Sequence, residues 1–211
     1  MRLTKLGHAC VRLEKDGRAL VIDPGTLTPQ PDALTGVEAV LITHEHFDHL
    51  DPDRLRAAVD ANPDLTVHTC LGAARHLSDL GDRVHVVRDG ETFTAAGFDV
   101  AVAGEHHRRT LPDVPPLDNV GFLVDSEVFH PGDAWTAVDA PTVLPALQAP
   151  WSTVADLVAY LRRTAVRRAY PVHDGLLNEH GLKVFDGVLA SEAERSGADI
   201  RRLRPGESVE L

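Results

Sequence analysis

Residues 39 to 49 read Ala39-Val40-Leu41-Ile42-Thr43-His44-Glu45-His46-Phe47-Asp48-His49. The first four residues form a short apolar run that is typical of a buried strand. Three histidines and an aspartate follow at its carboxyl end, the edge where layered α/β folds carry their sites. Neutral imidazoles and carboxylates suit zinc, manganese and iron, whereas an all-oxygen set favours calcium or magnesium. The segment therefore predicts a metal-dependent enzyme.

The spacing within this segment favours two ions over one. Four donors this close cannot all converge on one cation, but alternate side chains of an extended loop can share one. We expect His44 and His46 to bind one ion, and Asp48 and His49 to reach a second. A solvated, histidine-rich surface loop is the alternative. It is disfavoured because positions 44 to 49 contain no glycine, serine, asparagine or proline, the residues that ordinary loops use for turns.

The segment from His44 to His49 matches the HxHxDH signature of the metallo-β-lactamase superfamily, and later residues resemble that superfamily in the right order. The further matching residues are Asp23 in Val21-Ile22-Asp23-Pro24-Gly25, a histidine in Gly104-Glu105-His106-His107, Asp133 in His130-Pro131-Gly132-Asp133, and His173 in Tyr170-Pro171-Val172-His173. The resemblance spans nearly the whole chain. It implies an α/β fold, the four-layer αββα sandwich, built by residues 1–211 as a single domain.

Two shorter matches resemble one branch of the superfamily. Leu6-Gly7-His8-Ala9 and His49-Leu50-Asp51 look like the branch containing ascorbate-phosphate lactonases and the phospholipase D that acts on N-acyl phosphatidylethanolamines.

The resemblance also implies a ligand set for two divalent metal ions. The residues that would hold the first ion are His44, His46 and His107; those for the second are Asp48, His49 and His173; and Asp133 would bridge both. A bridging carboxylate keeps two ions within about 3.5–4 Å, close enough to share a water and make it a hydroxide nucleophile near neutral pH. Asp48 and Asp133 are therefore the expected catalytic carboxylates. Zinc is the expected metal, with manganese or iron as alternatives.

The third histidine of the first ion is open between two neighbours. His106 and His107 are adjacent, and a strand would point them to opposite sides, so only one should be a ligand. The superfamily's histidine often stands a few residues past a strand-end glycine such as Gly104, which favours His107. Strand parity alone leaves the choice open.

Other residues are expected to support the ligands or face the substrate. A metal-bound imidazole needs a partner for its second nitrogen, and Asp23, Thr43 and Asp51 are nearby candidates; a proton shuttle is an alternative role for Asp23. The remaining candidates are His8 at the pocket mouth, whichever of His106 and His107 is not a ligand, His130 as a hydrogen-bonding support, Trp135 with Trp151 as an apolar wall, and Arg108 with Arg109 as a grip for phosphate or carboxylate.

Composition and charge limit the partners. With 211 residues, 43% of them hydrophobic, the chain is long enough for one substantial core. The formal net charge of −11 opposes nucleic-acid binding, although a small anionic substrate remains compatible with two divalent cations. No apolar run approaches the roughly 20 residues of a membrane span and no secretion signal is visible, so a cytoplasmic protein is expected. Cys10 and Cys70 are expected to be buried thiols.

Hydrophobic periodicity predicts the order of the elements. The first half reads as strands at residues 3–5, 10–13, 19–22 and 40–42, a helix beginning at Asp51-Pro52, a strand at 65–70, a helix at 71–80 and a strand at 84–87. The second half reads as strands at 98–103, 120–124 and 128–130, a helix capped by Ser152, a strand at 170–173, a helix ending near Gly197 and a strand at 200–203. The proline-rich connections 111–118 and 140–151 are expected to wall the substrate pocket.

Together these observations predict a hydrolase that cleaves an ester, lactone or phosphodiester bond in a small metabolite. Two alternatives stay open: a mononuclear iron oxygenase-type enzyme, and a metal-bound scaffold that has lost turnover. Retention of Asp48, His49 and His173 disfavours the first, and the completely filled ligand pattern disfavours the second. The sequence does not identify the substrate or the oligomeric state.

Overall fold

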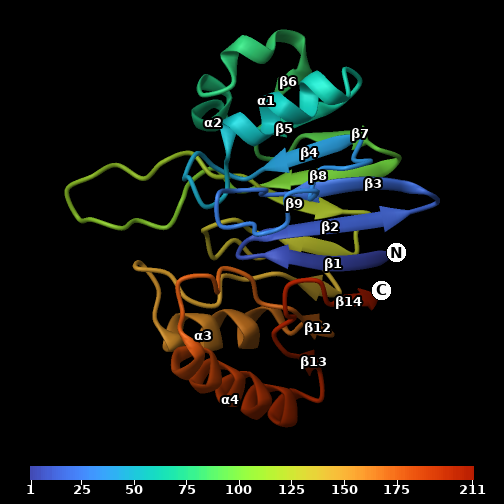
Figure 1. Ribbon diagram of the computed structural model, residues 1–211. Coiled ribbons are helices and arrows are strands. Elements are labelled where there is room, and N and C mark those ends of the chain that lie inside the picture. Colours follow the sequence, from blue (N-terminus) through green and yellow to red (C-terminus); the bar gives the residue numbers. More distant parts are fainter.

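The computed structural model describes residues 1–211 as two mixed β-sheets flanked by helices (Figure 1). The strands of the first sheet are β1 Arg2–Gly7, β2 Cys10–Lys15, β3 Arg18–Ile22, β4 Ala39–Ile42, β5 Thr66–Thr69, β6 Val84–Val86 and β14 Ser208–Glu210. Their spatial order is β14-β1-β2-β3-β4-β5-β6. β14 to β3 pair antiparallel, and β3 to β6 run parallel. The carboxyl ends of β3 and β4 therefore open onto the same edge.

The second sheet repeats this plan. Its strands are β7 Thr92–Ala95, β8 Phe98–Ala103, β9 Gly121–Val124, β10 Val128–His130, β11 Thr142–Val143, β12 Arg168–Ala169 and β13 Asp199–Ile200. β7 to β10 form an antiparallel meander, and β10 to β13 run parallel. The hairpin between β9 and β10 turns at Asp125 and Ser126, both with φ near +50°. Each half of the chain thus places a meander before a parallel run.

Four α-helices lie outside the sheets. They are α1 Pro52–Ala61, α2 Leu71–Arg75, α3 Val154–Thr164 and α4 Glu179–Ser196. α1 and α2 lie beside β5 and β6 at the top of Figure 1, and α3 and α4 lie beside β12 and β13 at the bottom. α1 begins as predicted, because Asp51 accepts a hydrogen bond from the Arg54 N–H in the first turn.

Two helix predictions are wrong in detail. The helix expected over 71–80 ends at Arg75, and a 3₁₀ turn over Ser78–Arg83 follows, in which Gly81 has φ +55°. α3 is capped by Thr153 and not by Ser152. The Thr153 hydroxyl accepts from the Asp156 N–H while the Asp156 carboxylate accepts from the Thr153 N–H, which is a reciprocal capping box.

The strand predicted at 170–173 is also wrong. β12 covers Arg168–Ala169, and Val172 makes only an isolated bridge to Ala146. His173 has φ +63°, in the left-handed region, so the extended chain stops there. β7, β11 and β14 were not predicted.

The core follows the layers. The larger apolar cluster joins the two sheets through residues such as Leu41 of β4 and Phe122 of β9, and also includes Leu55 of α1. A smaller one packs Leu157 of α3 and Leu189 of α4 on the second sheet. Cys10 and Cys70 are buried and free, which confirms the prediction for both. No helix has the length and apolar character needed to cross a membrane.

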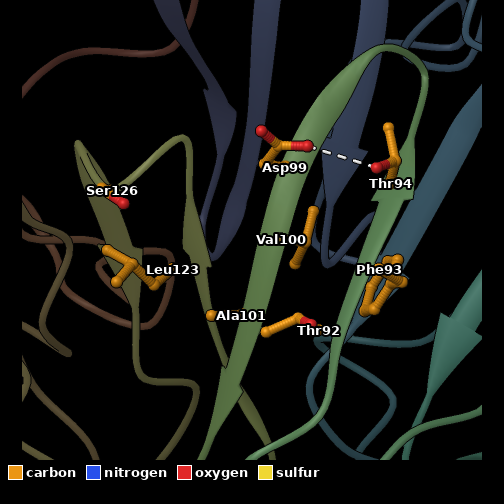
Figure 2. A pocket seen from close by; sticks show the side chains of 8 residues that line it. All are labelled: Thr92, Phe93, Thr94, Asp99, Val100, Ala101, Leu123 and Ser126. Carbon is orange, nitrogen blue, oxygen red and sulfur yellow. Dashed lines mark hydrogen bonds between the residues drawn. The ribbon is translucent and has the colours of Figure 1, made fainter.

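A hollow of about 410 Å³ lies on β7, β8 and β9. Figure 2 shows the side chains that line it. Its lining residues are Thr92, Phe93, Thr94, Asp99, Val100, Ala101, Leu123 and Ser126. Asp99 accepts a hydrogen bond from Thr94 and is the one charged side chain there. The hollow contains no histidine and lacks a group of convergent charged donors. The chemistry-bearing residues gather elsewhere.

Candidate metal centre

The segments that follow five strands bring the candidate residues together. Asp23 follows β3, residues 43–49 follow β4, His107 follows β8, Asp133 follows β10 and His173 follows β12. The side chains form two clusters, in each of which one donor atom per residue lies within 4.8 Å of the others. The first cluster contains His44, His46, His107 and Asp133, and the second cluster contains His8, Asp48, His49 and His173.

A network around Asp23 orients one histidine of each cluster. The Asp23 carboxylate accepts three hydrogen bonds of 2.7 Å, from the Thr43 N–H, the Thr43 hydroxyl and Nδ1 of His49. Because the Thr43 hydroxyl donates to Asp23, its oxygen accepts from Nδ1 of His44 at 3.0 Å. Both Nδ1 atoms therefore carry a proton, and in the neutral rings it is Nε2 that offers a lone pair to the clusters.

Two further imidazoles are held by main-chain carbonyls. Nδ1 of His107 lies 2.5 Å from the Arg108 carbonyl oxygen, and Nδ1 of His173 lies 2.6 Å from the Gln148 carbonyl oxygen. A carbonyl oxygen only accepts, so in the neutral ring Nε2 is again the nitrogen with the lone pair. In the first cluster, Nδ1 of His46 lies 3.0 Å from Nε2 of His44, which brings two ring nitrogens to one place.

Gly25 lets the turn after β3 pack directly on this segment. A Cβ atom at Gly25 would lie 2.1 Å from the carbonyl carbon of Asp48, a distance that no side chain tolerates. The close approach therefore requires glycine.

Asp133 lies between the clusters. Its Oδ2 is 3.3 Å from Nε2 of His107 in the first cluster and 3.3 Å from Nε2 of His173 in the second. Its Oδ1 is 3.3 Å from Nε2 of His49. Asp48 is the carboxylate of the second cluster, with Oδ2 3.3 Å from Nε2 of His173. One carboxylate thus touches both groups of nitrogens.

The charges in the clusters shift the pKa values in opposite directions. Burial lowers the pKa of His44 well below its ordinary value. Burial also disfavours protonated His173, but Asp133 and Asp48 outweigh it and raise its pKa to about 9. At Asp133 burial is outweighed by His49 and His173, and the pKa lies well below the usual range. The carboxylates stay ionised, and their field attracts positive charge.

Three buried atoms that face the clusters lack a hydrogen-bond partner: Nε2 of His49, Nε2 of His107 and Oδ1 of Asp133. A buried polar atom without a partner costs about 1–3 kcal/mol. Imidazole nitrogens and carboxylate oxygens are the ligands that zinc and similar divalent cations prefer. The residues present therefore fit two divalent metal ions.

The family model of the beta-lactamase superfamily domain matches residues 2–148. The chain belongs to this superfamily. It is 32% identical to Protein Rv0786c of Mycobacterium tuberculosis over 99% of both chains, and 26% identical to a UPF0173 metal-dependent hydrolase of Carboxydothermus hydrogenoformans over the full length of both. Igni18, a metallo hydrolase of Ignicoccus hospitalis, has the same fold, with a TM-score of 0.73, 19% identity and coverage of 100% of this chain and 98% of that chain.

The fold of this superfamily member is the αββα sandwich that the sequence predicts, and its two clusters resemble a binuclear metallo-β-lactamase site. Of the adjacent histidines, His107 is buried in the first cluster and His106 is exposed. His106 instead pairs with Asp118 at the base of a hairpin arm, residues 105–119, which protrudes from the body in Figure 1. The bridge between His106 and Asp118 is what points the two rings to opposite sides.

His130 and His8 are both supporting residues. Nε2 of His130 donates to the Ala9 carbonyl and its Nδ1 accepts from the Gly132 N–H, so neither nitrogen is left for a metal. The expectation that His8 lines the pocket mouth is wrong, since only 2% of it is exposed. The Gly175 N–H donates to its Nδ1, and its Nε2–H donates to Oδ2 of Asp48 at 3.1 Å.

Trp151, and not Trp135, contacts the metal centre. Trp135 packs on the rings of Trp151 and Tyr160. Nε1 of Trp151 donates to Oδ2 of Asp133 at 3.1 Å. Asp51 caps α1 and supports no cluster histidine, which corrects another expectation.

Of the two expected anion-gripping residues, Arg109 donates to the carbonyls of Pro112 and Val114 and so stabilises the arm. The sequence analysis missed the main-chain carbonyls of Arg108 and Gln148, which hold His107 and His173. Every residue has a main-chain carbonyl, so no residue type identifies them.

Proposed function

We propose that this superfamily member is a binuclear metal-dependent hydrolase that cleaves an ester, lactone or phosphodiester bond in a small molecule. The strongest support is the shared orientation of four imidazoles, each with Nδ1 bonded to oxygen and Nε2 facing the clusters. The UPF0173 relative and Igni18 are named for the same class of reaction. Two divalent cations, zinc by default with manganese or iron as alternatives, would activate water and polarise the scissile group.

The side chains of the two clusters provide ligands for two cation positions. The proposed ligands are His44, His46 and His107 for the first cation, Asp48, His49 and His173 for the second, and Asp133 for both. Asp23 is fully buried and accepts three hydrogen bonds, so it orients His49 and cannot reach a substrate as a proton shuttle. Asp48 and Asp133 are the proposed catalytic carboxylates.

The proposed substrate class rests on charge. Arg108 is exposed beside His107, and it is the cation nearest the first cluster in the sequence, which favours an anionic substrate. In the matches to the lactonase and phospholipase D branch, His8 supports Asp48, Leu50 is buried in the core and Asp51 caps α1. These roles serve the protein and not a ligand, so the two matches do not discriminate between substrates. The exposed Arg108 therefore makes an anionic phosphodiester the first compound to test.

We also propose that residues 1–211 act as one domain. β14 near the carboxyl terminus pairs with β1 near the amino terminus, so the first sheet needs both ends of the chain. The buried ion pair between Lys5 and Asp174, with 2.6 Å between Nζ and Oδ2, joins β1 to the segment after His173.

The test is turnover by the metal-loaded protein. Protein loaded with zinc or manganese is expected to hydrolyse at least one of a chromogenic phosphodiester, ester and lactone. His46→Ala should abolish this turnover and leave the fold intact, because the half-buried ring of His46 adds little to the core. His106→Ala is the matched control: His106 is one residue from a proposed ligand but exposed and outside both clusters, so its turnover should equal that of the wild type.

Unchanged turnover by His46→Ala would refute the ligand assignment. Two bound metals per chain without hydrolysis of any of the three substrates would indicate a scaffold. One tightly held iron with oxygen uptake would indicate an oxygenase.

A further inference from the structure

The indole of Trp151 contacts two residues of the first cluster. Its Nε1–H donates to Oδ2 of Asp133 at 3.1 Å. Its ring meets the imidazole of His107 edge to face, with the centroids 5.6 Å apart and the planes at 76°. The side chain is half-buried, and it is the hydrogen-bond partner of the Asp133 carboxylate that lies outside the clusters.

The oxygen that Trp151 contacts is the one between the clusters. Oδ2 of Asp133 lies 3.3 Å from Nε2 of both His107 and His173, whereas Oδ1 faces His49 and has no hydrogen-bond partner. A carboxylate in a binuclear site must present the right oxygen in the right direction. A donor fixed on Oδ2 restricts rotation of the carboxylate and so decides which oxygen faces both positions.

The segment that carries Trp151 also holds the second cluster. Residues 144–153, here called the brace, connect β11 to α3. The Gln148 carbonyl in the brace accepts from Nδ1 of His173 at 2.6 Å. The brace is itself anchored, because the Leu147 N–H donates to the Val172 carbonyl at 2.7 Å. One short segment therefore contacts a residue of each cluster.

We propose that Trp151 is a positioning residue that orients Asp133 as the shared carboxylate, and that the brace sets the spacing of the two metal positions. This inference rests on the proposed binuclear site. Without the indole N–H, Asp133 can rotate away from the position between the clusters. Loss of such a supporting partner typically weakens metal binding by about 10–100-fold.

The experiment compares two matched tryptophan variants. Trp151→Phe keeps an aromatic ring against His107 and removes only the N–H donor. Trp135→Phe makes the same change in the neighbouring ring, whose centroid is 5.5 Å from that of Trp151 and which belongs to neither cluster. In competition with a chromogenic chelator, Trp151→Phe should bind at least one of its two zinc ions about 10–100-fold more weakly than the wild type does. Trp135→Phe should bind both as the wild type does.

Fluorescence provides a second readout that does not require turnover. The chain contains two tryptophans, so each variant retains one of them. Zinc titration should change the emission of Trp135→Phe in step with binding, because its remaining indole is bonded to a ligand carboxylate. The emission of Trp151→Phe should respond much less. Trp151→His, which again offers a ring N–H, should recover part of the lost affinity.

Three results would overturn the inference. The first is wild-type affinity for both zinc equivalents in Trp151→Phe with an unchanged circular dichroism spectrum. The second is an equal loss in both variants, which would assign the effect to packing of the two rings. The third is a wild-type protein that binds no zinc, and this result would also refute the proposed function, whereas the first two would leave it standing.

Discussion

The two clusters differ in what holds their residues in place. In the second cluster two supports are buried side chains at the edge of the first sheet: Asp23 accepts from His49, and His8 donates to Asp48. The Gln148 carbonyl of the brace holds the third residue, His173. In the first cluster Thr43 holds His44, and the other supports come from loops. His107 is held by a carbonyl at the base of the arm, and Asp133 by the half-buried Trp151.

His46 makes the contrast sharper. Its ring is half-buried, and its Nδ1 faces Nε2 of His44. In His49 and His173, by contrast, Nδ1 is bonded to an oxygen atom. A buried side-chain network is rigid before any cation binds, whereas loop-held residues can adjust. The comparison teaches that buried side chains hold Asp48 and His49 of the second cluster, whereas loop segments hold His107 and Asp133 of the first. Removing His8, whose side-chain partner is Asp48, should therefore affect mainly the second cluster.

The largest expected effect is that of Asp23→Asn. Asp23 accepts three hydrogen bonds in a fully buried site. Burial lowers the pKa of His49, but Asp133 and Asp23 outweigh burial and raise this pKa well above its ordinary value. The asparagine amide removes the negative charge of Asp23, and its NH₂ group faces at least one of the groups that donate to the Asp23 carboxylate. We expect the free energy of unfolding of the metal-free protein to fall by about 3–5 kcal/mol, the usual result of breaking a buried pair. Guanidinium denaturation measures it.

The control for this change is Asp60→Asn on the exposed side of α1. It should alter the free energy of unfolding by less than about 0.5 kcal/mol. If Asp23→Asn were as stable as the wild type and still bound two metals, the second cluster would not depend on buried side chains, and the contrast between the clusters would be lost.

A smaller effect is expected for His8→Phe. The phenyl ring keeps the contact with the His173 ring, whose centroid is 4.1 Å away, and loses the Nε2–H that holds Asp48. One metal equivalent should bind about 10–100-fold more weakly, while the other keeps its wild-type affinity. Isothermal titration with zinc separates the two equivalents. An equal loss at both would show that the clusters respond as one unit and would contradict the division proposed here.

The ligand segments could be predicted from the sequence because strand ends converge. His44 to His49 follow an apolar run, and parallel strands bring their carboxyl ends to one edge, so the approximate location of the site follows from the pattern alone. The supports could not be predicted in the same way. Trp135 and Trp151 flank the same proline-rich segment, and only the packing brings Trp151 to Asp133. Every residue has a carbonyl, so nothing distinguishes Gln148.

The fold shows the same limit. Asp51-Pro52 marks the start of α1 by local chemistry, and the prediction is correct. Leu77 and Leu80 continue a helical spacing, yet α2 stops at Arg75, because Leu77 leaves the helical conformation with φ −120° and ψ 16° and a 3₁₀ turn over Ser78–Arg83 follows. β11 and β14 contain two and three residues, too few for an alternation to show. Their pairing is decided by the neighbouring strand and not by their own sequence.

The smallest expected effect concerns His68, a buried histidine outside both clusters. It pairs in register with His85, and its ring stacks on Phe93 with 4.3 Å between centroids. Burial, and then His85, lower the pKa of His68 to about 4. The unfolded chain therefore takes up this proton near pH 6.5, before the folded chain does. The stability that neutral His68 contributes is complete above pH 6.5 and is lost as the pH falls toward 4.

His68→Phe removes this titration and keeps the stacking on Phe93. The free energy of unfolding of the variant minus that of the wild type should rise by about 1 kcal/mol as the pH is lowered from 7 to 4.5. This is less than the full pKa difference of His68 implies, because one side of its ring faces a solvent cleft. Urea denaturation of both metal-free proteins measures it, and the cluster histidines cancel in the difference. A difference independent of pH would mean that His68 titrates alike in both states, and that burial outside the clusters does not shift a histidine.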